Sequence, residues 1–432
     1  HQPIYLKSNW INVWGDNQKT LYLNGVLNAD GGNGGLAVKQ NSIVVLTNNN
    51  TFAGAIWVEK GTVQVGTHTN AIGASGIVNV GTNATLDISG YGAQSIRPAV
   101  LNLYGTGTNT GHGALRKTSS SATSWRGNIN LGADSRIVVT GGGLSLYGAI
   151  TAATHTLYIT NTVTVSMQSG CTLSGSKTTG DGALHKSGSS TLYLRPSSGL
   201  SGSIWLQKGE IRQNTDNSAT IPSGGIFRMS DGVTYRSDGS ASRTNAKAAQ
   251  IDGNVTLGYS GGGELTFSGN MNLTAGQRTL TTLNNVVISG AVTNGGLTKA
   301  GAGTMILSGA NTYALGTLVS AGTLEGTTTS LQGNITNNSA VVFNQSGNGT
   351  YAGVLSGTGT LAKQGTGTVT LSGTSTQSGG TTVSAGTLLV SGSIGSSAVS
   401  VSSGGTLAGA GTVGALTMAS GSTVSPGNSS GT

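Results

Sequence analysis

Cysteine, proline and charged residues are all scarce in this chain of 432 residues. A single cysteine excludes a disulfide-stapled scaffold. Only 5 prolines, with glycines that follow no three-residue period, exclude a collagen-type helix. Charged residues make up 8% of the chain, which is too few for the surfaces of helical bundles or coiled coils. No run approaches the ~20 apolar residues that a membrane-spanning helix needs.

Glycine and short apolar runs are what the sequence has in abundance. There are 74 glycines, and 35% of the residues are hydrophobic. Valine, leucine and isoleucine stand in short runs where apolar and polar residues alternate, which argues against a disordered chain.

The charge is unevenly distributed. The net charge is +8, from 21 basic and 13 acidic residues, yet only Glu325 and Lys363 are charged after Ala300. The basic residues of the first 300 positions are thinly scattered rather than gathered in one stripe. We therefore predict no nucleic-acid partner.

One short motif, a leucine followed two or three residues later by a lysine, recurs along the chain. In most copies an apolar strand follows, and a second apolar element comes at a roughly constant offset, as at 56–63 and 318–324. Each element alternates with period two and is bounded by glycine, asparagine or serine, which is the signature of strands and turns. The lysines of the five copies are Lys39, Lys117, Lys186, Lys299 and Lys363.

These repeats predict an all-β fold, a single elongated parallel β-solenoid with about 20 residues per coil. Apolar ladders would fill the inside, and glycines would occupy the corners. We expect an N-terminal cap or interface segment at 1–35, less regular repeats at 36–294 with a looped insertion near 228–247, and regular repeats at 295–432.

The most regular segments resemble a known family. The stretches at 295–313 and 359–373, the Ser-Ala-Gly-Thr-Leu segments at 320–324 and 384–388, and the segment 424–432 resemble autotransporter-associated β-strand repeats. This resemblance implies a right-handed parallel β-helix, the passenger of a secreted or surface protein of a bacterium. Such passengers are usually followed by a membrane β-barrel translocator, and the sequence leaves open whether one follows Thr432.

No catalytic, cofactor-binding or metal-binding residue is predicted. Asp181 precedes His185 by four residues, but Thr298 and Ala362 hold the place of this histidine in other copies, which indicates a surface position. His1 would need a second histidine nearby to chelate copper. For the repeated lysines, we expect ammonium groups that reach water or turn carbonyls rather than an anionic partner. A glycosidase would need paired carboxylates, and coil stacking is the one way to gather them here; the candidates are Asp216, Asp231, Asp238 and Asp252.

The chain ends supply the candidate interfaces. Trp10 and Trp14 precede the first repeat, whereas Trp57 and Trp205 share one repeat position, which favours a structural role. Residues 390–432 contain no charge, so the last coil has no charged residue to protect its open edge. Either more chain follows, or another molecule covers this end; the second case predicts head-to-tail stacking of identical chains. The candidate interface residues are Trp10, Trp14, Val424 and Pro426.

The sequence therefore predicts a non-enzymatic, extracellular structural protein, secreted or at the cell surface of a bacterium. Its expected role is surface adhesion, biofilm matrix or a head-to-tail filament. Its expected partners are other copies of itself and the glycans of host or neighbouring cells. The alternative is a polysaccharide-binding or polysaccharide-cleaving β-helix.

Overall fold

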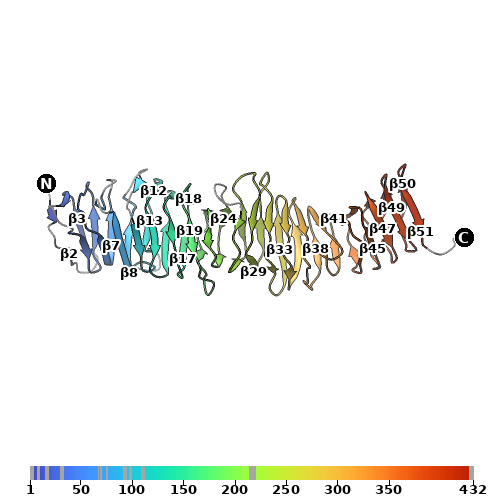
Figure 1. The fold of residues 1–432 in the computed structure, drawn as a ribbon, viewed down its shortest axis with the longest axis horizontal. Helices are drawn as coiled ribbons and strands as arrows, with labels where there is room; N and C mark the ends of the chain where they lie inside the picture. The colour runs from blue at the N-terminus through green and yellow to red at the C-terminus, as the bar shows by residue number, and fades with distance from the viewer. Residues whose placement is uncertain are drawn as a thin grey trace. The chain divides into compact units, whose positions relative to one another are not determined.

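The computed structural model describes residues 4–6, 10–14, 19–29, 34–66, 68, 71–73, 76–90, 95–96, 100–108, 112–213 and 220–427. Every regular element in these ranges is a β-strand, and none is a helix long and apolar enough to cross a membrane. The chain divides by contact into two compact units, residues 1–228 and 229–432. In Figure 1 the strands of each unit stand side by side, coil after coil.

The first unit winds so that each strand pairs in parallel with a strand one coil later. Its first two faces share the long strands β7 (Ile56–Val65) and β8 (Ile77–Asp87), which run across the corner between them. The first face also holds β2 (Ile11–Val13), β5 (Leu36–Val38), β10 (Val100–Leu103), β13 (Asn128–Leu131), β16 (Ile150–Thr151), β19 (Leu173–Gly175) and β22 (Pro196–Leu200). The second face also holds β3 (Thr20–Leu23), β6 (Ile43–Leu46), β11 (Leu115–Lys117), β14 (Ser135–Val139), β17 (Leu157–Asn161), β20 (Leu184–Lys186) and β23 (Ile204–Leu206). The third face holds β9 (Ser95–Ile96), β12 (Thr123–Trp125), β15 (Leu144–Leu146), β18 (Val165–Met167), β21 (Thr191–Leu194) and β24 (Glu210–Gln213). The remaining strands are β1 (Ile4–Leu6), which pairs with β4 (Leu27–Ala29), and β25 (Thr220–Ile221) and β26 (Ile226–Met229).

The core of the first unit is a set of apolar ladders. In one ladder on the first face, an inward residue of each coil stacks on its partner in the next coil, and each is at most 2% exposed. Burial of this apolar area at every coil stabilises the stack, because a single coil has no core of its own. The ladder consists of Leu36, Ile56, Val78, Leu101, Ile129, Ile150 and Leu173.

The strands of the second unit are also stacked in parallel, coil after coil. One sheet holds β27 (Val233–Ser237), β30 (Val255–Leu257), β33 (Gln277–Thr282), β36 (Gly296–Ala300), β38 (Thr317–Val319), β40 (Ile335–Asn337) and β43 (Leu355–Ser356). A second holds β28 (Arg243–Asn245), β31 (Leu265–Phe267), β34 (Val286–Ile288), β37 (Thr304–Leu307), β39 (Thr323–Gly326), β41 (Ala340–Asn344), β44 (Thr360–Gln364), β46 (Thr381–Val383), β48 (Val399–Val401) and β50 (Leu416–Met418). Two shorter sets are β29 (Ala248–Ile251), β32 (Met271–Asn272) and β35 (Val292–Thr293), then β42 (Gly349–Tyr351), β45 (Thr368–Leu371), β47 (Gly386–Val390), β49 (Gly405–Gly409) and β51 (Thr423–Pro426). Its longest apolar ladder is Leu265, Val286, Met305, Leu324, Val341 and Leu361.

The expected all-β parallel solenoid is confirmed, whereas one local expectation differs from the structure. Around 228–247 we expect a looped insertion, but the segment contains β27 and β28, which pair in register with β30 and β31. In this stretch buried Val233 and Tyr235 alternate with outward polar residues, so the segment forms ordinary coils. The right-handed sense and the boundaries at 35 and 294 stay predictions.

Candidate functional site

The four candidate interface residues lie on exposed surface of their own units. Trp10 and Trp14, beside β2, are 41% and 65% exposed. Val424 is 48% exposed, and Pro426 is also exposed; both belong to β51. Trp10 lines a surface cleft that is described below. A role for the four in an interface stays a prediction.

The repeated lysines belong to strands whose pairing follows the sequence repeat. In three copies the strand with the leucine and the lysine pairs with the strand about 20 residues later. The lysine there is the second residue after the leucine, so both point inward. Lys186, Lys299 and Lys363 are each at most 1% exposed, and so is Lys117.

Each buried ammonium closes a turn from inside the coil. Lys299 Nζ donates to the carbonyls of Ala300, Gly301 and Ala321 at 3.0, 2.8 and 2.9 Å. Lys363 Nζ does the same with Gln364, Gly365 and Ala385 at 2.8, 2.8 and 3.1 Å. In both cases two acceptors lie on the turn after the lysine and the third on the next coil. An ammonium has three donors and no acceptor, so it matches this set of carbonyls. The ammonium groups reach turn carbonyls, as expected, but they do so from the core rather than from the surface.

A glycine in the next coil makes room for this arrangement. Gly322 and Gly386 have positive φ of 66° and 64°. A Cβ on Gly386 would press on the carbonyl oxygens of Gly365 and Gly367 and on Lys363 Nζ. The glycine of the Ser-Ala-Gly-Thr-Leu segment is therefore required by its backbone conformation and by the buried ammonium beneath it.

Burial changes the proton affinity of these lysines. It lowers the pKa of Lys186 to about 7 and the pKa of Lys299 to about 8, and it also lowers the pKa values of Lys117 and Lys363. Lys247 is likewise fully buried, and burial lowers its pKa to about 8. Sequence reasoning missed Lys247 because no leucine stands two or three residues before it. Its place within the long interval between Lys186 and Lys299 is the signal that could have found it.

In the first copy of the motif, the lysine lies at the surface rather than in the core. Lys39 is the third residue after Leu36, and Val38 takes the inward place opposite Val58. The lysine therefore points outward, where its side chain is 26% exposed and pairs with Glu59 at 2.5 Å.

Next to this ion pair lies an aromatic cleft of about 430 Å³. The register stacks Asn12, Ala37 and Trp57 on three successive coils. Trp57 is 37% exposed, and Ala37 is buried. The ring of Trp10 lies against Gly35, where any Cβ would collide with the indole. The cleft is lined by Trp10, Asn12, Ala37, Lys39, Trp57 and Glu59.

Trp205 occupies the same repeat position as Trp57 but lies in a closed column. Its ring stacks on His185 with centroids 4.4 Å apart, and the Arg228 guanidinium lies 4.4 Å from its ring centroid. His185 in turn contacts Tyr158, whose hydroxyl donates to Asp181 at 2.7 Å.

His185 is not the surface residue expected from the sequence, since it is only 7% exposed. The rings of Tyr158 and Trp205 on the neighbouring coils cover both sides of it. Burial lowers its pKa, and this is opposed by Gln207 and Asp181, with the ring Nδ1 3.7 Å from the Asp181 carboxylate. The column therefore packs three rings from three successive coils side by side.

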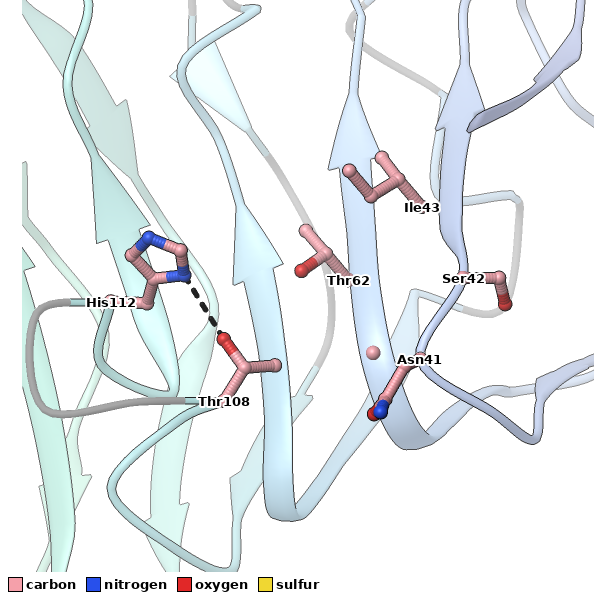
Figure 2. A pocket seen from close by; sticks show the side chains of 7 residues that line it. Asn41, Ser42, Ile43, Thr62, Thr108 and His112 are labelled. Carbon is pink, nitrogen blue, oxygen red and sulfur yellow. Dashed lines mark hydrogen bonds between the residues drawn. The ribbon is translucent and has the colours of Figure 1, made fainter. Parts of the chain in front are cut away.

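A smaller pocket of about 190 Å³ lies beside Ser42, Thr62 and His112 (Figure 2). His112 Nδ1 is 3.0 Å from the hydroxyl of Thr108, which lies 3.3 Å from the hydroxyl of Thr85. Burial and then Arg116 lower the pKa of His112, with Asp87 acting in the opposite direction. The residues that line the pocket include no carboxylate to orient the imidazole, so they do not form a nucleophile-activating triad.

Metal-ligating groups do not gather in the described ranges. There, no group of three or more His, Cys, Asp or Glu side chains could hold a metal ion. Asp231 accepts a hydrogen bond from the Asn254 amide, and Asp252 accepts one from the Gln250 side chain. His1 and Asp216 lie outside the described residues.

Three segments of the chain match the Passenger-associated-transport-repeat family: residues 42–65, 297–325 and 361–390. These three segments are passenger-type repeats. The second and third segments contain Lys299 with Gly322 and Lys363 with Gly386, so the turn described above lies within the repeat. The resemblance drawn from the sequence is thereby confirmed.

A curated relative is also an autotransporter protein by name. Over 52 residues the chain is 52% identical to the "Adhesin BmaC autotransporter" of Brucella suis biovar 1 (strain 1330). The match covers 11% of this chain and 2% of that relative. The chain thus spans only a small part of the relative's length.

Proposed function

We propose that this protein is a non-enzymatic passenger β-helix that is secreted or displayed at the surface of a bacterium and acts in adhesion. The observation that carries this is the set of passenger repeats, which contain the buried lysine turns of the second unit. The name of the relative, an adhesin autotransporter, supports the same role.

The physical basis for such a role is an outer surface built separately from the core. Each coil contributes its apolar residues to the inner ladders and its outward residues to the surface. Outward residues can therefore vary from coil to coil without disturbing the ladders, as Trp57 and Asn102 do above the buried Ile56 and Leu101. This separation suits a scaffold that presents binding groups along its faces.

Display of the chain tests this proposal. A non-adherent bacterium would carry the 432 residues on a surface scaffold, and binding to epithelial cells and to abiotic surfaces would be counted. The matched control is the same scaffold alone, at equal surface density. We expect several-fold more bound cells with the chain; equal binding would overturn the adhesion proposal.

We further propose that copies of the chain stack head to tail, which would make a filament or a biofilm matrix. In the last coil described, Leu416 and Met418 continue inner positions of β48, and Val424 continues Leu407. They are 41%, 37% and 48% exposed. A further coil in the same register would bury them, and a second copy could supply that coil.

Sedimentation of the purified chain of 432 residues tests the stacking. We expect assemblies that grow with protein concentration and that a Met418→Asp variant reduces to monomers. A Thr417→Asp variant, with the charge on the outward side of the same strand, is the control. Monodisperse monomers at all concentrations would contradict this proposal while leaving the adhesion proposal intact.

A further inference from the structure

The cleft beside the first repeat has the features of a ligand site. Its aromatic walls come from different coils, Trp10 from the coil of β2 and Trp57 from that of β7. Between them Ala37 leaves a low floor, because its side chain is only a methyl group. The volume of about 430 Å³ is in the range of small-molecule sites.

One face of the Trp57 indole is already held in place. Its ring stacks on Tyr104 with centroids 6.3 Å apart and planes inclined by 15°. This stacking fixes the indole by contact on the side of the later coils, so little side-chain entropy remains to be lost on binding. The other side faces the coil of Ala37, whose methyl group cannot cover an indole.

The polar groups of the cleft are matched to a neutral ligand rich in hydroxyl groups. Lys39 and Glu59 form an ion pair of zero net charge, and Asn12 adds an amide that both donates and accepts. A lining of this kind offers no surplus cation for a phosphate or a carboxylate. Flat aromatic faces beside paired donors and acceptors suit a pyranose, whose ring presents C–H groups on its faces and hydroxyls at its edge.

We propose that the cleft between Trp10 and Trp57 binds a neutral pyranose unit of a glycan. The sugar ring lies over Ala37 against the open face of Trp57, and its hydroxyls bond with Asn12, Lys39 and Glu59. This deepens the adhesion proposal by naming a partner class, and it rests on that proposal only for the access of the chain to surface glycans.

Titration of the purified chain tests the site. The probes are methyl β-D-glucopyranoside, methyl β-D-galactopyranoside and β-linked oligosaccharides of each, followed by tryptophan fluorescence and calorimetry. We expect saturable binding, at least tenfold weakened in Trp57→Ala and in Ala37→Phe, which fills the floor. Sodium glucuronate should bind more weakly than the neutral sugars.

The chain supplies a matched control in Trp205→Ala, because this tryptophan has the same repeat position with both faces covered. Trp14→Ala is a second control, since this exposed indole does not line the cleft. Both should bind sugar within twofold of the parent, and circular dichroism would verify that every variant is folded. Absence of saturable binding by any neutral sugar, or equal binding by Trp57→Ala and Ala37→Phe, would overturn the site. Neither result would bear on adhesion of the displayed chain, which is measured separately.

Discussion

Two copies of one motif, at the beginning and the end of the chain, place their lysines in opposite environments. In the copy at 361–363 the lysine is two residues after the leucine, lies in the core and donates to three carbonyls. In the copy at 36–39 it is three residues after the leucine, lies at the surface and pairs with Glu59. One extra residue reverses the side of the strand, because strand side chains alternate.

The two equivalent tryptophans also differ, because their neighbours on the preceding coil are different residues. Trp57 and Trp205 hold the same place after their motifs, but the residue one coil earlier is Ala37 in one case and His185 in the other. A methyl group leaves an indole face open, whereas an imidazole covers it. The function of a repeat position is thus set by its partner across the coil.

The largest expected effect separates the inward and outward lysines. Lys363→Met should lower the free energy of unfolding by about 3 kcal/mol, because it strips the donors from three partly buried carbonyls. Lys39→Met should cost less than about 1 kcal/mol, since it removes only a partly exposed ion pair. Urea unfolding followed by circular dichroism measures both, and equal losses would contradict the inward role of Lys363.

The next effect concerns the glycine above the buried ammonium. Gly386→Ala should lower the free energy of unfolding by about 3 kcal/mol, from its positive φ together with contacts against the Gly365 and Gly367 carbonyls. Gly404 is the matched control: its φ is 79°, yet an added Cβ would meet no atom within 4 Å. Gly404→Ala should therefore cost only the backbone strain, about 1 kcal/mol. Equal costs for the two variants would show that crowding at the turn contributes nothing.

The pH dependence of stability should reveal the buried lysines. Burial lowers the pKa of Lys186 to about 7 and the pKa of Lys299 to about 8, whereas their ordinary pKa is 10.5. Between these values the unfolded chain binds more protons than the folded one, so stability rises as the pH increases from about 7 to about 10. Burial also raises the pKa of Tyr158 to about 12, so stability should fall again above pH 10.

Melting temperatures across pH 6 to 11 would check this maximum. The control is the double variant Lys186→Met with Lys299→Met, whose rise between pH 7 and 10 should be flatter than that of the parent. A parent melting temperature that falls steadily from pH 7 upward would exclude lowered lysine pKa values.

The smallest effect is expected from variants that exchange the surroundings of the two tryptophans. Ala37→His should cover the open face of Trp57 and shift its fluorescence emission to shorter wavelength, because water is excluded from the indole. His185→Ala should do the reverse at Trp205. Each change should alter stability by about 1 kcal/mol. Unchanged emission in both variants would mean that the cross-coil neighbour does not control indole exposure.

The sequence by itself determined the architecture. Period-two alternation, corner glycines and a recurring leucine–lysine motif predict stacked parallel coils, and the pairs Leu297 with Thr317 and Leu361 with Thr381 have the predicted offset of one coil. These features are local, so each repeat displays them within a few residues.

The tertiary structure decided which side of each strand a residue occupies and what covers it. It placed Lys363 in the core and Lys39 at the surface, buried His185 between two rings, and left a cleft above Ala37. The physical reason is register: a contact across coils joins residues about 20 positions apart, and a shift by one residue exchanges inside for outside. Residue types alone do not fix that register, whereas the paired strands do.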